Sequence, residues 1–321
     1  MTLPEKNDII EAHKRIDTYI HRTPVLTSRS INILLNSRLF FKCENFQKVG
    51  AFKFRGATNA VLQLSDYESR NGVATHSSGN HAAALALAAK LRGIPSYIVM
   101  PENSPEIKKK AVKGYKAKIT YCKPTLEARK SELEKIVKKT RAIFIHPYDN
   151  FQVICGQGTT AKELIEDYPS LDIVIAPVGG GGLLSGTATW VKNYNNKIEV
   201  IAAEPEKADD AYRSFKSGIL QPSLNPDTIA DGLLTSLSEM TFSIISEKVD
   251  DIIRVSEETI ILAMRMVWER MKIIIEPSSA VALAAVIEKP ERFANKKVGI
   301  ILSGGNVDLK NLLILSFHIP A

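Results

Sequence analysis

The sequence predicts a two-domain α/β protein in which each domain is a mostly parallel sheet flanked by helices. Three observations support this fold class. The chain has 321 residues, about twice the usual domain length of roughly 150, and 45% of them are hydrophobic. From Gly72 onward, short β-branched runs alternate with amphipathic segments. A second alternating series follows and is interrupted by a run of four glycines.

The first series of elements predicts the smaller sheet. Short apolar runs predict strands at residues 73–76, 96–100, 117–122 and 142–146. An Ala-rich run predicts a helix at 80–91, and an apolar stripe predicts another at 126–140. Because strands and helices alternate, we expect the strands to be parallel. We assign the unit to a small domain of residues 68–149.

The second series predicts the larger sheet. We expect strands at 173–178, 199–203 and 298–302 and helices at 159–168, 183–194, 257–271 and 279–285. The first 65 residues, which include a strand-like run at 39–43, do not open the small sheet cleanly, so we attach them to this series. Residues 1–67 and 150–321 are therefore expected to form one large domain, with a cleft between it and the inserted small one.

The charge and composition exclude several classes of protein. The chain carries 42 Lys and Arg against 35 Asp and Glu, but its tight basic clusters, 108–110 and 138–139, fall inside helix-like segments, so we expect no nucleic-acid partner. No apolar run reaches the roughly 18 residues of a membrane span, and no signal-peptide pattern is present. We therefore expect a cytoplasmic protein. Cys43, Cys122 and Cys155 lack metal-site spacing and are interpreted as buried small hydrophobes.

A lysine in apolar company is the first candidate for chemistry. Lys53 stands between Phe52 and Phe54. Burial lowers the pKa of an ammonium group, which is what a Schiff-base lysine requires. By itself the pattern is weak, because a solvated lysine at the start of a helix or strand is the ordinary alternative.

Two turns are candidates for binding anions. Residues 75–81 (Thr-His-Ser-Ser-Gly-Asn-His) join an expected strand to a helix, where backbone N–H groups can hold a carboxylate. Residues 179–182 are four glycines between a strand and a helix, a pattern typical of a phosphate-binding turn. This turn does not match the G-x-G-x-x-G fingerprint, yet Glu204 lies about 20 residues on, so a nicotinamide-dependent dehydrogenase stays open as an alternative.

The last expected strand delivers Ser303 at its carboxyl end, followed by Gly-Gly-Asn. In this order, the four segments resemble the serine/threonine dehydratase group of pyridoxal-phosphate enzymes, and within it the members that racemise serine. The resemblance runs from about Arg22 to Asp308 and includes residues 44–48, 156–159, 203–205, 228–232 and 268–272. It implies the tryptophan-synthase-β-like architecture known as fold type II, in which residues 68–149 would be a mobile domain that binds the substrate and the large domain would bind the cofactor.

The resemblance implies a role for each matching residue. Lys53 would join the cofactor covalently, Phe52 would pack on its ring, Asn80 would reach the ring hydroxyl and Ser303 would face the pyridine nitrogen. The phosphate would lie on Gly179, Gly180, Gly181 and Gly182. The substrate would be bound by Ser77, Ser78, Gly79, Asn80, His81, Arg129 and Asp231.

The residues also restrict the reaction. A serine beside the pyridine nitrogen cannot keep it protonated, which favours α-proton exchange and β-elimination over transamination. Racemisation needs a base on each face of the α-carbon, and the resemblance implies Lys53 and Ser78. Loss of water from serine would leave an enamine, which water then hydrolyses to pyruvate and ammonia. A threonine or 3-hydroxyaspartate dehydratase is the alternative, because the pocket for the β-substituent cannot be identified from the sequence.

Two further ligands and a partner are implied by the resemblance. Glu204, Asp210 and the carbonyl of Ala208 match a divalent-cation position suited to Mg²⁺, with Ca²⁺ or Mn²⁺ as alternatives. ATP, bound between two subunits of a homodimer, would meet Lys48, Lys108, Tyr115, Lys272 and Asn306. Here the sequence departs from the group: Ala82 and Ala83 replace a Gly-Gln pair, and Lys116 replaces a glycine, so nucleotide activation is only an option.

Overall fold

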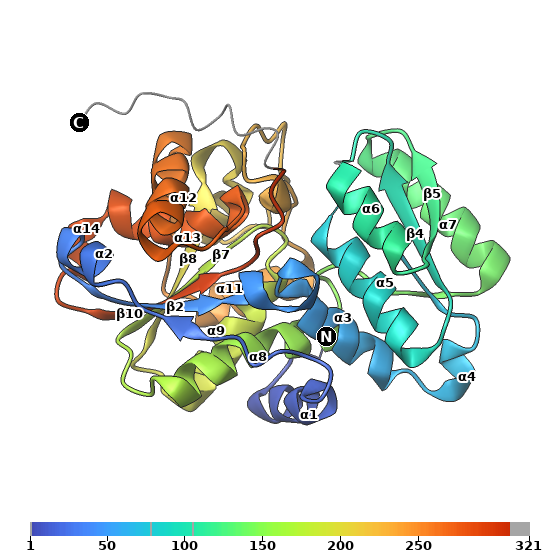
Figure 1. The fold of residues 1–321 in the computed structure, drawn as a ribbon, viewed down its shortest axis with the longest axis horizontal. Helices are drawn as coiled ribbons and strands as arrows, with labels where there is room; N and C mark the ends of the chain where they lie inside the picture. Colours follow the sequence, from blue (N-terminus) through green and yellow to red (C-terminus); the bar gives the residue numbers. More distant parts are fainter. Residues whose placement is uncertain (1, 78, 105, 309–321) are drawn as a thin grey trace.

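The computed structural model describes residues 2–77, 79–104 and 106–308, and within them the chain forms two sheets (Figure 1). The larger sheet contains, in spatial order, β1 (Val25–Leu26), β2 (Arg38–Cys43), β10 (Lys297–Leu302), β7 (Ile173–Pro177), β8 (Glu199–Pro205) and β9 (Asp251–Val255). Only the pair β1–β2 is antiparallel in this sheet as described. The smaller sheet is parallel throughout and contains β5 (Lys118–Cys122), β4 (Ser96–Pro101), β3 (Val73–His76) and β6 (Ile143–Phe144).

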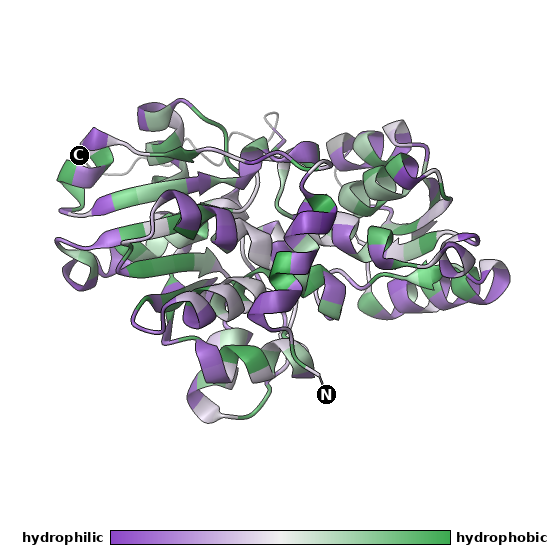
Figure 2. Ribbon diagram, turned by 90° about the horizontal axis from the view of Figure 1, so that it is seen from below, coloured by the Kyte–Doolittle hydropathy of each residue, from purple (hydrophilic) through white to green (hydrophobic). Residues whose placement is uncertain are grey.

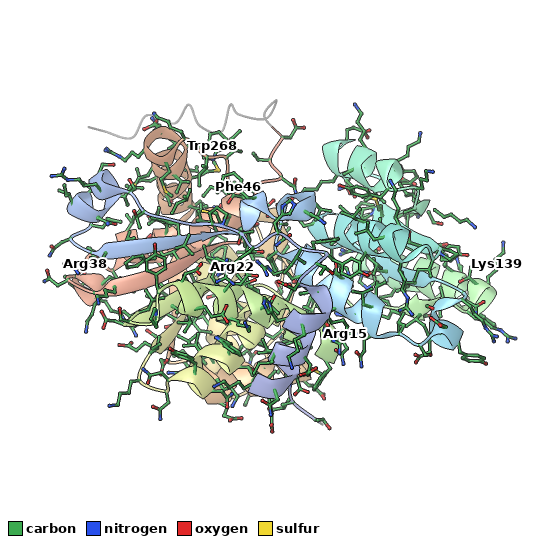
Figure 3. All side chains as sticks on the ribbon, turned by 60° about the horizontal axis from the view of Figure 1, so that its bottom comes forward. Arg15, Arg22, Arg38, Phe46, Lys139 and Trp268 are labelled. Carbon is green, nitrogen blue, oxygen red and sulfur yellow. The ribbon has the colours of Figure 1, made fainter. Side chains whose placement is uncertain are left out.

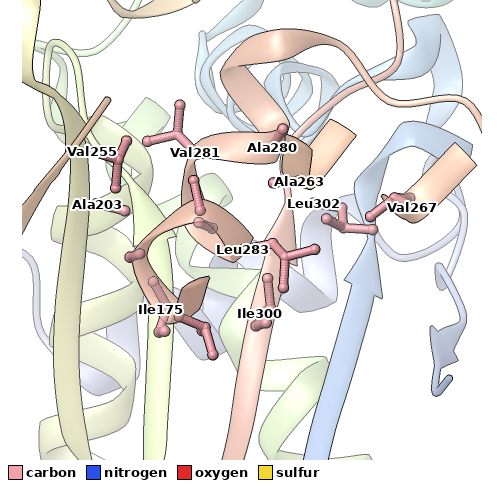
Figure 4. Packing of buried hydrophobic residues seen from close by; sticks show 14 of the residues in the cluster. Ile175, Ala203, Val255, Ala263, Val267, Ala280, Val281, Leu283, Ile300 and Leu302 are labelled. Atoms are coloured by element: carbon pink, nitrogen blue, oxygen red, sulfur yellow. The ribbon is translucent and has the colours of Figure 1, made fainter. Parts of the chain in front are cut away.

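The large sheet is covered by helices on both faces. One face packs on α12 (Glu257–Met271) and α13 (Pro277–Glu288), and the other on α8 (Phe151–Asp167) and α9 (Gly182–Tyr194), with α1 (Lys6–Ile16) outside them. Successive strand residues alternate between the two faces: Ile300 and Leu302 pack on α13 beside Leu283 (Figure 4), while Ile301 belongs to the opposite core. Apolar runs without alternation are therefore needed in these strands.

The small sheet is also a three-layer unit. One core joins it to α5 (Asn80–Arg92), α6 (Glu106–Gly114) and α3 (Lys53–Gln63), and the other to α7 (Leu126–Thr140). Val73 and Ala74 face opposite cores, as period-two alternation requires. Strands β3 to β6 all lie within residues 73–144, between segments of the large sheet. The predicted fold class is confirmed, whereas the exact domain boundaries stay a prediction.

The remaining elements connect these layers. They are α2 (Arg29–Leu34), α4 (Asp66–Ser69), α10 (Asp210–Ser217), α11 (Glu239–Lys248), α14 (Pro290–Phe293), η1 (Glu44–Phe46), η2 (Lys48–Gly50), η3 (Glu206–Ala208) and η4 (Asp231–Leu233). Helix α8 starts eight residues before the predicted position 159, because the side chain of Asn150 caps it by accepting from the N–H of Val153. Gly156 and Gly158 have low helix propensity, so propensity alone does not predict that the helix starts this early.

Surface composition follows the layers. Hydrophobic residues concentrate on the strands of the large sheet, and hydrophilic residues are distributed over the outer helices (Figure 2). Basic side chains are spread widely: Arg38 and Lys139 lie at opposite ends of the molecule and Arg15 lies between them (Figure 3).

The three cysteines are buried and unpaired, as predicted. Within the described ranges, no helix combines the length and hydrophobicity that crossing a bilayer demands.

Candidate active site

Lys53 is the first residue of α3, and its amine points into the protein. The Nζ atom donates to the carbonyl oxygen of Pro147 at 2.9 Å and lies 5.0 Å from the centroid of the Phe52 ring. Burial lowers the pKa of Lys53 to about 8, although the negative charge of Glu276 acts in the opposite direction. The amine is therefore much closer to its neutral, nucleophilic form than an exposed lysine at the same pH.

The segment that carries Lys53 is attached to the end of the last strand of the large sheet. The N–H of Phe52 donates to the carbonyl of Ser303 at 3.0 Å, and Ala51 forms an isolated bridge with Gly304. Ser303 is 3% exposed. Two sequence segments 250 residues apart thus form one wall of the site, at the carboxyl edge of the sheet where open α/β folds bind ligands.

The predicted carboxylate turn lies between β3 and α5. The side-chain oxygen of Ser77 accepts from the N–H of Gly79 at 3.3 Å, and Gly79 precedes α5 without providing a side-chain cap. Among the residues that the structure describes, no side chain caps the first N–H groups of α5, which suits the binding of an anion. Ser78, the predicted second base, lies outside the described residues.

His81, in the first turn of α5, is 2% exposed, and its Nε2 lies 3.2 Å from the carbonyl oxygen of Ile145. Burial and the nearby Lys53 hold the pKa of His81 well below its usual value, so the ring is neutral. No described residue pairs with its Nδ1.

Asn80 belongs to a polar network that sequence analysis missed. Its side-chain amide donates to Glu276 Oε1 at 2.8 Å, and its oxygen accepts from Asn306 Nδ2 at 3.0 Å. Glu276 Oε2 also accepts from the N–H of Asn306 at 3.2 Å. Burial raises the pKa of Glu276 to about 7, and the Lys108 charge partly offsets this. The signal in the sequence was an acidic residue directly before Pro277 at the start of an apolar helix.

The four glycines lie where β7 ends and α9 begins, as predicted. A Cβ at Gly180 would lie 2.3 Å from the ring of Tyr148, and Gly181 adopts φ +85°, a conformation that disfavours other residues. Backbone N–H groups at the start of this 13-residue helix therefore form a turn without side chains, which suits a phosphate. Tyr148 was missed by sequence analysis, although it follows a strand of the small sheet directly after His146 and Pro147.

Two other predicted substrate residues differ in their surroundings. The Nε of Arg129, on α7, donates to the carbonyl of Thr125 at 3.4 Å, and its positive charge helps lower the pKa of His76 to about 4 after burial. Asp231, at the start of η4, pairs with Lys108 of α6 at 2.5 Å. This ion pair connects the small-sheet unit to the large one.

The predicted cation residues lie together after β8. Both oxygens of Glu204 accept backbone N–H groups, from Ala211 at 2.9 Å and Tyr212 at 2.7 Å, while neither oxygen of Asp210 has a hydrogen-bond partner among the described residues. Burial raises the pKa of Glu204 well above its usual value and that of Asp210 to about 6. Two buried carboxylates, of which Asp210 has no hydrogen-bond partner among the described residues, fit a hard divalent cation. The described residues contain no cluster of three or more acidic, His or Cys side chains that could hold a metal.

The residues predicted to meet ATP make contacts within the chain. Lys108 pairs with Asp231, and Asn306 donates to the carbonyl of Val49 at 2.7 Å as well as to Asn80. Lys272 donates to the carbonyl of Glu269, Lys48 lies 5.9 Å from the ring of Phe54, and Lys90 lies over the ring of Tyr115. Lys116 adopts φ +66°, which gives a physical reason for a glycine at this position in the resembling group.

Taken together, the two mostly parallel sheets, the inward-pointing lysine and the side-chain-free glycine turn define a pyridoxal-phosphate enzyme of fold type II. The model of the family described as "Pyridoxal-phosphate dependent enzyme" matches residues 16–304. The chain belongs to this family.

Two proteins of described activity are similar to this chain over most of its length. The chain is 54% identical to the serine racemase of Dictyostelium discoideum over 95% of both chains, and the crystal structure of that protein superposes with a TM-score of 0.91, covering 95% of this chain and 99% of the other. It is also 50% identical to the β-hydroxyaspartate dehydratase of Paracoccus denitrificans over 97% of this chain and 99% of the relative.

Proposed function

We propose that the protein is a pyridoxal-phosphate-dependent enzyme that interconverts L- and D-serine and, in a side reaction, converts serine to pyruvate and ammonia. When bound, the cofactor withdraws electrons from the α-carbon of an amino acid and so makes its proton acidic. The near identity in length and the 54% identity to a serine racemase support this activity.

Different residues of the chain would bind the cofactor, transfer the proton and bind the substrate. Lys53 holds the cofactor and moves the proton on one face of the α-carbon, and Ser78 moves it on the other. The turn of Ser77, Gly79, Asn80 and His81 binds the substrate carboxylate, with Arg129 and Asp231 at its edge. The neutral hydroxyl of Ser303 would not keep the ring nitrogen protonated, which favours proton exchange and elimination.

The observation that carries the proposal is the position of the Lys53 amine, which donates to the carbonyl of Pro147 at 2.9 Å from a segment hydrogen-bonded to Ser303. Borohydride reduction followed by peptide mass spectrometry tests it, and we expect the cofactor adduct on Lys53. An adduct on another lysine, or none, would contradict the proposal.

The two-base assignment has its own test. Ser78→Ala is expected to abolish formation of D-serine from L-serine. Ser77→Ala, which removes the other hydroxyl of the same turn, is expected to weaken substrate binding for racemisation and elimination alike. Racemisation that continues undiminished in folded Ser78→Ala would exclude Ser78 as a base. Pyruvate is measured in parallel, since elimination needs only one face of the α-carbon.

A dehydratase acting on 3-hydroxyaspartate is the second candidate. The Paracoccus relative favours it, and so does Arg129, which is half-buried and forms no ion pair with any described acid. An unpaired guanidinium can bind a second carboxylate. Comparing kcat/KM for serine and 3-hydroxyaspartate, with Arg129→Lys as the variant, separates the two activities.

We further propose a divalent cation, Mg²⁺ before Ca²⁺ or Mn²⁺, at Glu204, Asp210 and the carbonyl of Ala208, and a homodimer as the assembly. Chelation should lower the melting temperature and activity, and light scattering should give twice the chain mass. ATP activation, through the five residues named above, is tested by titrating ATP into the racemisation assay.

A further inference from the structure

Four charged side chains, one of them on the same helix as Lys53, are almost completely buried, and no role has been assigned to them. They are Lys42 of β2, Glu44 of η1, Arg55 of α3 and Glu163 of α8, which we call the charge quartet; each is at most 1% exposed. Arg55 Nε and Nη2 donate to Glu44 at 2.7 and 2.8 Å, and Nη1 and Nη2 donate to Glu163 at 2.7 and 2.8 Å. Lys42 donates to Glu163 at 2.6 Å.

The guanidinium of Arg55 therefore joins η1 and its own helix α3, which are close in the sequence, to α8, which lies about 100 residues further along the chain. Its bidentate pairs fix both the position and the plane of the group, which a single ammonium cannot do. Thr23 and Thr159 complete the arrangement: the hydroxyl of Thr23 donates to Glu44 at 2.6 Å, and that of Thr159 accepts from Arg55 at 3.2 Å. The charges sum to zero and both carboxylates are fully paired.

Stability alone does not explain such an arrangement. Removing charges from water costs several kcal/mol per ion, and replacing a buried ionic cluster by apolar side chains of similar volume is often neutral or stabilising. The chain nevertheless holds four charges together in a large domain whose buried clusters consist mainly of Ile, Val, Leu and Ala. A requirement for defined geometry is the physical reason that remains.

The geometry is directed at the start of α3. Arg55 is the third residue of this helix and Lys53 the first, so their side chains leave the helix about 200° apart, on nearly opposite faces. The helix has no side-chain N-cap, because Phe52 precedes it. Lys53 reaches toward Pro147 from one side, and the quartet holds the same helical turn from the other.

We propose that Arg55 is a positioning residue that, through Glu44 and Glu163, fixes the first turn of α3 and thereby the place of the Lys53 amine. The inference rests on the proposed role of Lys53. The quartet acts by holding the helix in position and not through its electric field, because its net charge is zero. Burial lowers the pKa of Lys53 and Glu276 raises it, and no quartet residue is among these causes.

Arg55→Lys tests the proposal in the holoenzyme, because it keeps the charge and loses the fork. A displacement of about 1 Å at a catalytic group lowers the rate by up to roughly 100-fold. We expect kcat to fall 10- to 100-fold with KM changed less than about threefold, since the carboxylate-binding turn is untouched. We also expect a weaker circular dichroism band of the bound cofactor, which reports how it is held.

The matched control is Arg292→Lys. Arg292 also bridges two carboxylates, Asp251 and Glu199, but these lie at the amino ends of β9 and β8, at the edge of the sheet opposite the glycine turn. The Arg292→Lys variant is expected to leave kcat and the dichroism unchanged.

In the cofactor-free full-length chain, the pH midpoint for alkylation of Lys53 should be the same in Arg55→Lys and the unmodified protein.

A second variant replaces all four quartet residues by methionine. It is expected to fold with a melting temperature close to that of the unmodified protein and to show the same loss of kcat and dichroism as Arg55→Lys, or a larger one. If it does not fold, the Arg55→Lys result decides.

Unchanged kcat and dichroism in folded Arg55→Lys, or a shifted alkylation midpoint, would overturn the positioning role. Absence of the Lys53 adduct in the unmodified protein would instead overturn the proposed function, and this inference with it.

Discussion

Glu276→Gln removes a carboxylate that is 3% exposed and whose pKa is about 7 in the folded chain, against 4.5 for an unperturbed glutamate. Below pH 4.5 the group is protonated in the folded and unfolded states alike. Above pH 7 it is charged in both, and the folded state carries the desolvation penalty. The unmodified protein should therefore lose stability as the pH rises from 4.5 through 7, whereas the variant has no such group.

The size of the effect follows from the pKa difference. A shift of about 2.5 units at roughly 1.36 kcal/mol per unit corresponds to a contribution on the order of 3 kcal/mol. Glutamine also presents an N–H₂ group where the N–H of Asn306 needs an acceptor, which destabilises the variant. That loss does not depend on pH and cancels when one variant is compared at two pH values.

Urea unfolding of the cofactor-free chain at pH 4.5 and pH 7.5 measures the effect. Relative to the unmodified protein, Glu276→Gln should become more stable on going to pH 7.5, by about 3 kcal/mol. Glu269→Gln, which changes an exposed glutamate, is the control and should show no such trend. A difference between Glu276→Gln and the unmodified protein that is the same at both pH values would refute the reasoning.

The remaining predictions concern three other parts of the site. Gly180→Ala should weaken cofactor binding at least tenfold in a fluorescence titration, because its Cβ would meet the ring of Tyr148 at 2.3 Å; unchanged affinity would exclude the glycine turn as the phosphate site. Asp210→Asn should raise the melting temperature of the cation-free protein at pH 8, since the pKa of Asp210 is raised to about 6, and should abolish any gain from Mg²⁺. A double-mutant cycle of Lys108→Ala and Asp231→Ala should give a coupling energy of no more than about 1 kcal/mol, because Asp231 is half exposed; high salt should reduce it.

Local patterns predicted the fold well where local forces decide it. The β-branched runs at 73–76 and 173–178 became β3 and β7, and the glycine run became the turn before α9. The ends of two elements differ from the prediction. Helix α8 starts earlier because Asn150 caps it. Strand β6 covers two residues where five were predicted, because β3 pairs with only Ile143 and Phe144.

The sequence by itself determined the family resemblance, the alternation of strands and helices, and the lysine, glycine and serine motifs, because each is a pattern among neighbouring residues. Only the tertiary structure decided which distant residues meet them: Pro147 and Glu276 at Lys53, Tyr148 at Gly180, and Glu44 with Glu163 at Arg55. The pKa of a buried group depends on how much water its neighbours exclude and which charges they bring. Those neighbours come from segments 90 or more residues away in most of these contacts, so no local pattern contains them.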